Sequence, residues 1–93
     1  MAEFDAPTYY LDLADSWNRG QIANLEIGQS ASLHVRREDR QDLPAISAAG
    51  ERTADGLQVT VTIDGNDQHF RWPWDLLQDA VKYQRRLEMR RAR

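Results

Sequence analysis

Apolar and polar residues alternate most regularly between positions 57 and 72. In 57–63 every second residue is apolar, which is the period of a strand that buries one face. The alternation returns in 68–72, after a short polar stretch that contains Gly65. Two alternating segments joined by a glycine-containing turn are typical of a β-hairpin. The pattern therefore predicts hairpin strands at 57–63 and 68–72.

The length of the turn sets which residues of this hairpin face each other. A two-residue loop of Gly65 and Asn66 is expected, because glycine adopts positive φ without steric cost. The apolar pairs on one face are then Val61 with Phe70 and Val59 with Trp72. The other face is polar throughout, so the hairpin is expected to bury a single face.

Two further segments lie upstream of the hairpin. Residues 30–37 alternate between apolar and polar side chains and predict a strand. Near 43–54, a start at Asp42-Leu43-Pro44 is followed by apolar residues at helical spacing, and we expect a helix there. A strand is the alternative for this second segment, because Gly50 weakens a helix.

A C-terminal helix is expected to follow the hairpin over 75–92. Pro73 ends the preceding strand, and Asp75 with Gln78 forms a capping-box pattern at the helix start. The apolar residues share one helical stripe, formed by Leu76, Leu77, Ala80, Tyr83 and Leu87. This stripe is expected to pack across the apolar face of the hairpin.

The N-terminal third has the least regular pattern. Tyr10 and Trp17 fit an N-terminal helix that is capped near Thr8 and ends at Gly20. The alternation in 9–13 also fits a short strand, and we favour the helix. Together these elements predict a small single α+β domain over 1–93, with an antiparallel-rich sheet and helices on one of its faces.

The composition is that of a soluble globular protein. Of the 93 residues, 41% are hydrophobic and 29% are charged. No apolar run approaches a membrane span of about 20 residues, and the chain has no cysteine, which excludes disulfides and thiolate metal ligands. We therefore expect a cytoplasmic protein without membrane contact. Arginine outnumbers lysine by eleven to one, which favours a GC-rich bacterial or phage genome as its source.

Charge is divided unevenly along the chain. Residues 82–93 carry a net charge of +5, whereas residues 1–81 carry −8. Basic residues near a helix end are favoured by the helix dipole alone. They also suit an acidic partner or a phosphate backbone, so the asymmetry keeps both classes of partner open.

The sequence offers no catalytic constellation and no cofactor motif. His34 and His69 each fall on the polar side of a predicted strand, outside any histidine motif for metal binding. No serine lies in a nucleophile motif, and the five glycines are dispersed rather than gathered in a phosphate-binding loop. We therefore expect a protein that is not an enzyme and uses no cofactor or metal.

Protein binding is the function that the composition favours. Eight aromatic residues are many to bury in a domain of this size, and aromatic and arginine side chains commonly anchor interfaces. The candidate contact residues are Tyr9, Tyr10, Trp17, Trp74, Arg85, Arg86, Arg90 and Arg91. We expect a bacterial or phage regulator or inhibitor that binds another protein through them.

Other partners fit the same features. Nucleic-acid binding by the basic C-terminal helix is one alternative, although the acidic remainder of the chain would repel phosphates. A structural subunit of a larger assembly is a further alternative. Leu77 and Val81 give the predicted helix a second apolar edge, which suits a homodimer.

Overall fold

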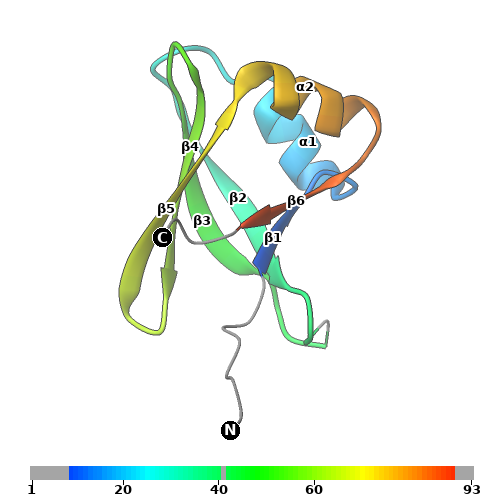
Figure 1. The fold of residues 1–93 in the computed structure, drawn as a ribbon, viewed down its shortest axis with the longest axis vertical. Helices are drawn as coiled ribbons and strands as arrows, with labels where there is room; N and C mark the ends of the chain where they lie inside the picture. Colours follow the sequence, from blue (N-terminus) through cyan, green and yellow to red (C-terminus); the bar gives the residue numbers. More distant parts are fainter. Residues whose placement is uncertain (1–8, 41, 90–93) are drawn as a thin grey trace, which may run out of the picture.

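A computed structural model, which describes residues 9–40 and 42–89, shows a curled six-stranded antiparallel sheet with two helices (Figure 1). The elements in chain order are β1 (Tyr9–Asp12), α1 (Ser16–Ala23), β2 (Ser30–Arg37), β3 (Ile46–Arg52), β4 (Gly56–Ile63), β5 (Asn66–Pro73), α2 (Trp74–Lys82) and β6 (Arg86–Met89). The strand order across the sheet is β5-β4-β3-β2-β1-β6. The predicted α+β class and the strand at 30–37 are confirmed, whereas the arrangement of the helices differs from the prediction.

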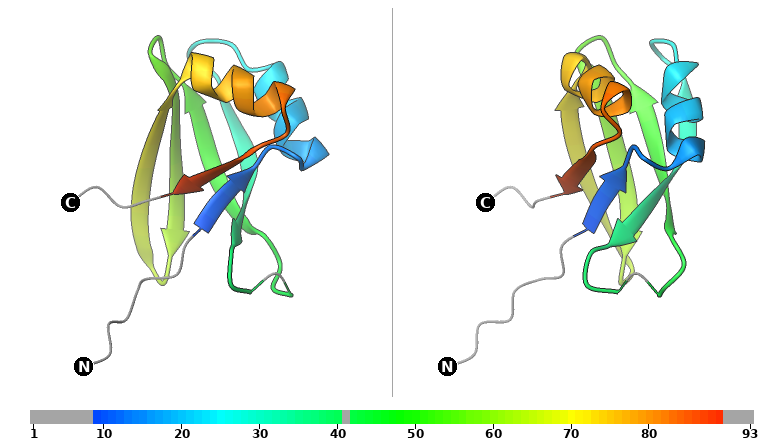
Figure 2. Two further views of the ribbon diagram at one scale, coloured as in Figure 1. Left: turned by 45° about the vertical axis from the view of Figure 1, so that its right-hand side comes forward. Right: turned by 90° about the vertical axis from the view of Figure 1, so that its right-hand side faces the viewer.

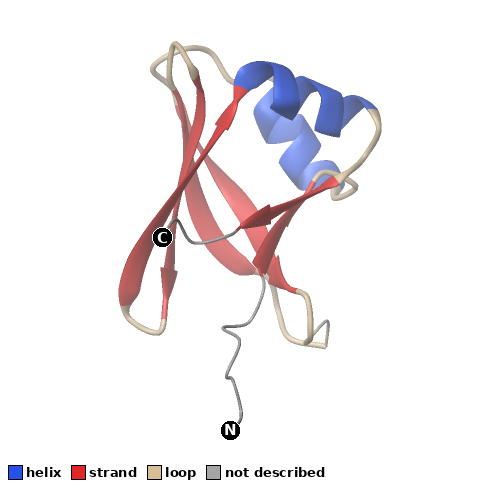
Figure 3. Cartoon of the chain, in the orientation of Figure 1, coloured by secondary structure: helices blue, strands red, loops and turns tan. Residues whose placement is uncertain are grey.

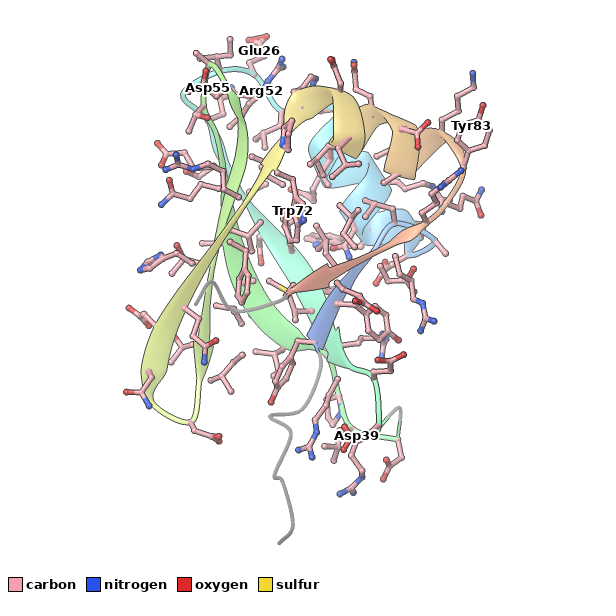
Figure 4. The ribbon with its side chains drawn as sticks, viewed as in Figure 1. Glu26, Asp39, Arg52, Asp55, Trp72 and Tyr83 are labelled. Carbon is pink, nitrogen blue, oxygen red and sulfur yellow. The ribbon has the colours of Figure 1, made fainter. Side chains whose placement is uncertain are left out.

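The strands and both helices bury one shared set of apolar side chains. α2 packs against β4 and β5, and α1 packs against β2. Both helices lie toward the same end of the sheet, while the turn between β4 and β5 lies at the other end (Figures 2 and 3). The fully buried side chains include Leu11, Leu33, Leu57, Val59 and Leu77. Trp72 points from β5 toward this core, so α2 covers the apolar face of the hairpin (Figure 4).

The predicted hairpin is confirmed, but its register is shifted by two residues. The loop consists of Asp64 and Gly65 rather than Gly65 and Asn66, so that Val59 faces Phe70. Both loop residues have positive φ, 52° for Asp64 and 79° for Gly65. Positive φ at both positions is the requirement of a type I′ turn, for which Asp-Gly is a favoured sequence. A shift of two residues leaves the same side chains on the buried face.

The helix expected near 43–54 is wrong, because this segment contains β3 in the middle of the sheet. β3 pairs with β2 on one side and with β4 on the other, which satisfies its backbone on both edges. Gly50 belongs to this packing, since a Cβ there would lie 2.7 Å from a methyl carbon of Leu33. The alternative reading as a strand was the correct one.

The helix predicted over 75–92 is also wrong in extent, because α2 ends at Lys82. Its N-cap is Pro73, with no side-chain hydrogen bond, so the expected capping box does not form. Leu77 and Ala80 are buried as predicted, but Leu76 and Tyr83 of the same stripe are exposed.

The end of α2 is a Schellman motif built without glycine. Gln84 has a φ of 53°. The N–H of Arg85 donates to the carbonyl of Ala80 (2.9 Å), and the N–H of Gln84 donates to that of Val81 (3.4 Å). The chain then reverses into β6, and Leu87 reaches the core from a strand instead of a helix.

The N-terminal helix expected from Thr8 to Gly20 is displaced along the chain. Residues 9–12 form β1, as the alternative of a short strand proposed, and α1 runs from Ser16 past Gly20. The carboxylate of Asp15 caps α1 by accepting a hydrogen bond from the backbone N–H of Trp17 (2.8 Å). Capping by Asp15 therefore starts the helix seven residues after the expected cap.

Candidate functional site

Trp17 is a large aromatic side chain that is both exposed and held in place. Its exposed fraction is 46%. Its ring stacks on the imidazole of His34, with centroids 5.6 Å apart and planes inclined by 12°. Its indole N–H donates to the carbonyl of Ser32 (2.9 Å). Since both contacts come from β2, they fix the exposed ring against the sheet.

His34 is held from a second side by Asp15. The Nδ1 atom of His34 lies 3.4 Å from a carboxylate oxygen of Asp15, whose other oxygen caps α1. One carboxylate thus orients both the helix that carries Trp17 and the ring on which Trp17 stacks. The sequence analysis placed His34 on the polar face of its strand, but gave it no part in the site.

Tyr10 is buried beneath an arginine on the same side of the sheet. Its neighbours Tyr9 and Leu11 pack into the core, so the alternation of β1 turns Tyr10 to the opposite face. There only 4% of its surface is exposed, and the guanidinium carbon of Arg86 lies 4.7 Å from the ring centroid. Tyr10 is therefore a support for Arg86 and not an exposed anchor.

Arg36 joins these two groups into one surface. It pairs with Tyr10 across β1 and β2, and it lies on the same face of β2 as His34. Among the described residues, neither Arg36 nor Arg86 forms an ion pair with a carboxylate. We call the set of Trp17, His34, Arg36, Tyr10 and Arg86 the Trp17–Arg86 surface.

A shallow groove of about 530 Å³ continues this surface across the outer face of the sheet. Its floor carries short side chains from β2, β3 and β4, and Asp67 of β5 also lines it. The short side chains include Ser32, Ser47, Ala49, Thr60 and Thr62. Ser32 is also the residue whose carbonyl holds Trp17. A partner anchored at Trp17 therefore finds an open and weakly polar floor beside it.

The structure places Trp74 and Tyr9 away from this surface. Trp74 is half-buried against the core, and the guanidinium of Arg52 stacks on its ring at 3.9 Å. Arg52 also donates to the carbonyl of Leu25 (2.9 Å), and it lies at the end of the sheet that carries the helices (Figure 4). Tyr9 is half-buried against the core as well. Both aromatic side chains pack against the core, and the sequence alone did not distinguish this packing from a role at an interface.

The predicted arginines divide into three cases. Arg86 belongs to the Trp17–Arg86 surface. Arg85 is exposed beyond α2, where it lies 3.7 Å from a carboxylate oxygen of Asp79 and 5.3 Å from the ring centroid of Tyr83. Arg90 and Arg91 lie outside the described residues.

The described part of the chain was also compared with the requirements of a metal site and of a membrane-spanning helix. Residues 9–40 and 42–89 contain no group of three or more histidine, aspartate or glutamate side chains placed to hold a metal ion. Neither described helix has the length and apolarity to cross a membrane. No family model, curated protein or solved structure matches the chain.

Proposed function

We propose that the protein is a non-enzymatic protein-binding module whose contact site is the Trp17–Arg86 surface. The observation that carries the proposal is an exposed tryptophan fixed by a stacked ring and a hydrogen bond. Tryptophan and arginine are the residues most often found to dominate binding energies. A side chain that is already ordered loses little conformational entropy on binding, so its contact area contributes more to affinity.

The chemistry of the surface favours an acidic partner segment. Arg36 and Arg86 present guanidinium groups without described carboxylate partners, and such groups form strong paired hydrogen bonds with carboxylates. Of the acids near the surface, Asp15 already caps α1 and faces His34, and Glu88 lies on β6 opposite Tyr10. We infer that the partner inserts an apolar group beside Trp17 and places carboxylates over the two arginines.

The biological role that fits such a module is regulation by occlusion. We infer that the chain acts by covering a functional surface of its target. We therefore propose a regulator or inhibitor of another protein as the role, in keeping with the expectation from composition.

A selection of short random peptides displayed against the immobilised full chain tests this proposal. We expect the enriched peptides to be acidic and to contain an aromatic or aliphatic residue. Trp17→Ala should weaken their binding by roughly thirtyfold or more, as for an interface anchor. Arg36→Glu and Arg86→Glu should each weaken binding as well, with the larger effect at low salt.

Arg85→Glu is the matched control, because Arg85 is an exposed arginine adjacent to Arg86 but outside the surface. It should change affinity by less than about threefold, since exposed rim charges contribute little. Circular dichroism of each variant establishes that the fold is kept. Enriched peptides that are not acidic, or that bind the folded Trp17→Ala and Arg86→Glu variants as tightly as the unchanged chain, would refute the proposal.

A further inference from the structure

β5 ends the sheet opposite to β6, and its outer edge has a defined set of backbone groups. The two-residue turn makes the flanking residues Ile63 and Asn66 a hydrogen-bonded pair, and such pairs alternate along an antiparallel ladder. The N–H and C=O groups of Asp67, His69 and Arg71 therefore point away from β4. None of them has a backbone hydrogen bond to another described residue outside β4.

The side chains of these same three residues are exposed and ordered along β4. The carboxylate of Asp67 accepts a hydrogen bond from Thr62 (2.6 Å). The Nδ1 atom of His69 lies 3.0 Å from the hydroxyl of Thr60, and Arg71 donates to Gln58 (3.2 Å). Each partner is the residue directly opposite on β4. The edge thus presents a fixed row of one acid, one histidine and one base.

In an antiparallel pair of two β5 strands, this row of charges on one copy is complementary to the same row on the other. If two β5 strands run antiparallel with His69 opposite His69 of a second copy, Asp67 of each copy faces Arg71 of the other. All three outward residues then exchange backbone hydrogen bonds with the second copy. We propose that a second copy of this chain docks edge to edge on β5 in this register, around a two-fold axis through His69.

Other antiparallel registers between two β5 strands are less favourable, because they meet Pro73, the turn or like charges. A shift that pairs His69 with Arg71 brings Asp67 opposite Pro73, which has no N–H to donate. A shift that pairs Asp67 with His69 carries Arg71 past the end of the strand, opposite Gly65 in the turn. Registers centred on Asp67 or Arg71 place like charges opposite each other. Charged residues commonly protect a sheet edge against pairing. Here like charges disfavour the registers centred on Asp67 or Arg71, whereas the register centred on His69 pairs opposite charges.

This proposal does not depend on the Trp17–Arg86 surface. That surface is built on α1, β2, β1 and β6, whereas β5 is separated from β2 by two strands in the sheet order. A dimer through β5 would carry two such surfaces and would bind a divalent target with increased avidity.

Sedimentation velocity of the full chain over a range of concentrations tests the second copy as the occupant. We expect a monomer–dimer equilibrium. Arg71→Asp and Asp67→Arg should each raise the dimer dissociation constant by about ten- to a hundredfold, because each reversal affects both symmetric charge pairs. The double variant with both changes should restore dimerisation, since it exchanges the two charges without altering their pairing.

Two further variants separate the edge from other surfaces. Glu51→Arg, a charge reversal on the exposed face of β3 away from the edge, should leave dimerisation unchanged. His69→Pro removes a backbone N–H that points outward, and such a proline is tolerated on an edge strand, so the monomer should fold but no longer pair. Circular dichroism distinguishes loss of pairing from loss of folding.

Each remaining outcome overturns the proposal. A chain that stays monomeric at every concentration has no second copy on β5, and any edge-pairing partner is then a foreign strand. A dimer that tolerates both single reversals and His69→Pro uses another surface. Single reversals that disrupt the dimer without recovery in the double variant contradict the register that places Asp67 opposite Arg71.

Discussion

The side-chain amide of Asn18 hydrogen-bonds both backbone groups of His34, as a neighbouring strand residue would. Its Oδ1 accepts from the N–H of His34 (2.8 Å), and its Nδ2 donates to the carbonyl of His34 (3.0 Å). The same Nδ2 donates to the carbonyl of Asp12 (3.0 Å), where β1 ends. α1 therefore satisfies the edge of β2 beyond the last pair with β1, and Asn18 is fully buried to do so.

Replacement of Asn18 should be among the most destabilising polar substitutions in this chain. Asn18→Ala leaves the backbone groups of His34 buried without partners, and we expect a loss of about 3 kcal/mol in the free energy of unfolding. Asn18→Asp should cost at least as much, because a carboxylate has no hydrogen to donate to the two carbonyls. Urea denaturation measures both. Asn24→Ala is the control, since Asn24 is exposed and its amide donates to the carbonyl of Gly20 in α1. An equal cost there would contradict the role assigned to Asn18.

Two glycine-to-alanine substitutions should change the free energy of unfolding in opposite directions. Gly65→Ala places a Cβ at a φ of 79°, and we expect a loss of about 1 kcal/mol although no atom lies within 4 Å of the added carbon. Gly20→Ala lies inside α1, also with nothing within 4 Å, and should gain roughly 0.5–1 kcal/mol. Thermal and urea unfolding of the two variants provide the comparison. If both variants changed the unfolding free energy in the same direction, the positive φ of the turn would not explain the effect of Gly65→Ala.

Glycine at position 84 should stabilise the end of α2. Gln84 has a φ of 53°, in the region where a side chain is strained and glycine is not. We expect Gln84→Gly to raise the free energy of unfolding by about 0.5–1 kcal/mol, whereas Gln78→Gly within α2 should lower it by about 1 kcal/mol. Chemical denaturation of both variants measures this contrast, and a destabilised Gln84→Gly would argue against the Schellman motif.

The loop after β2 should hold two carboxyl groups with lowered pKa. The guanidinium of Arg37 donates to Asp39 (2.9 Å for Nη2) and lowers the pKa of that carboxyl, and Arg40 lowers the pKa of Asp42 in the same way. Because the folded pKa lies below the unfolded one, any stabilisation is present at neutral pH and is lost as the pH falls through the folded pKa. Titration followed by NMR should show that Arg37→Gln raises the pKa of Asp39 and leaves Asp42 unchanged. Equal pKa values for Asp39 with and without Arg37 would exclude the contact in solution.

The elements that could be predicted from sequence are those with strong contrast between their two faces. Val59 and Val61 alternate with threonines, so the hairpin was evident from its period alone. In β3 the inward residues include Ala48 and Gly50, which are too small to give a clear apolar alternation. The three-residue spacing of Ile46 and Ala49 is instead typical of a helix. The identity of β3 as a strand depends on two neighbours in space, which a local pattern does not contain.

The C-terminal error has a different cause. A helix that ends at glycine is visible in a sequence, but α2 ends at Gln84 in a left-handed conformation that glutamine rarely adopts. The arginines that follow are good helix formers, so the pattern continued past the true end.

The candidate site was predicted in its residue types and only partly in its geometry. Trp17 and Arg86 were both named, and both lie exposed on one surface. Arg36 was missed because it lies within an alternating strand and shows its relation to Tyr10 only through the pairing of β1 with β2. Trp74 was named as an anchor, yet Arg52 covers it from a strand that the sequence presented as a helix.

The place of β1 between β2 and β6 has a consequence for the order in which the molecule assembles. β2, β3, β4 and β5 each neighbour the next strand in sequence, so their pairing closes only short loops. β6 must meet Tyr9–Asp12 across almost the whole described chain, and contacts of such separation form slowly. In refolding we expect the hairpins of β2–β5 to form first, and Leu11 and Leu87 to meet in the core only when β6 pairs with β1.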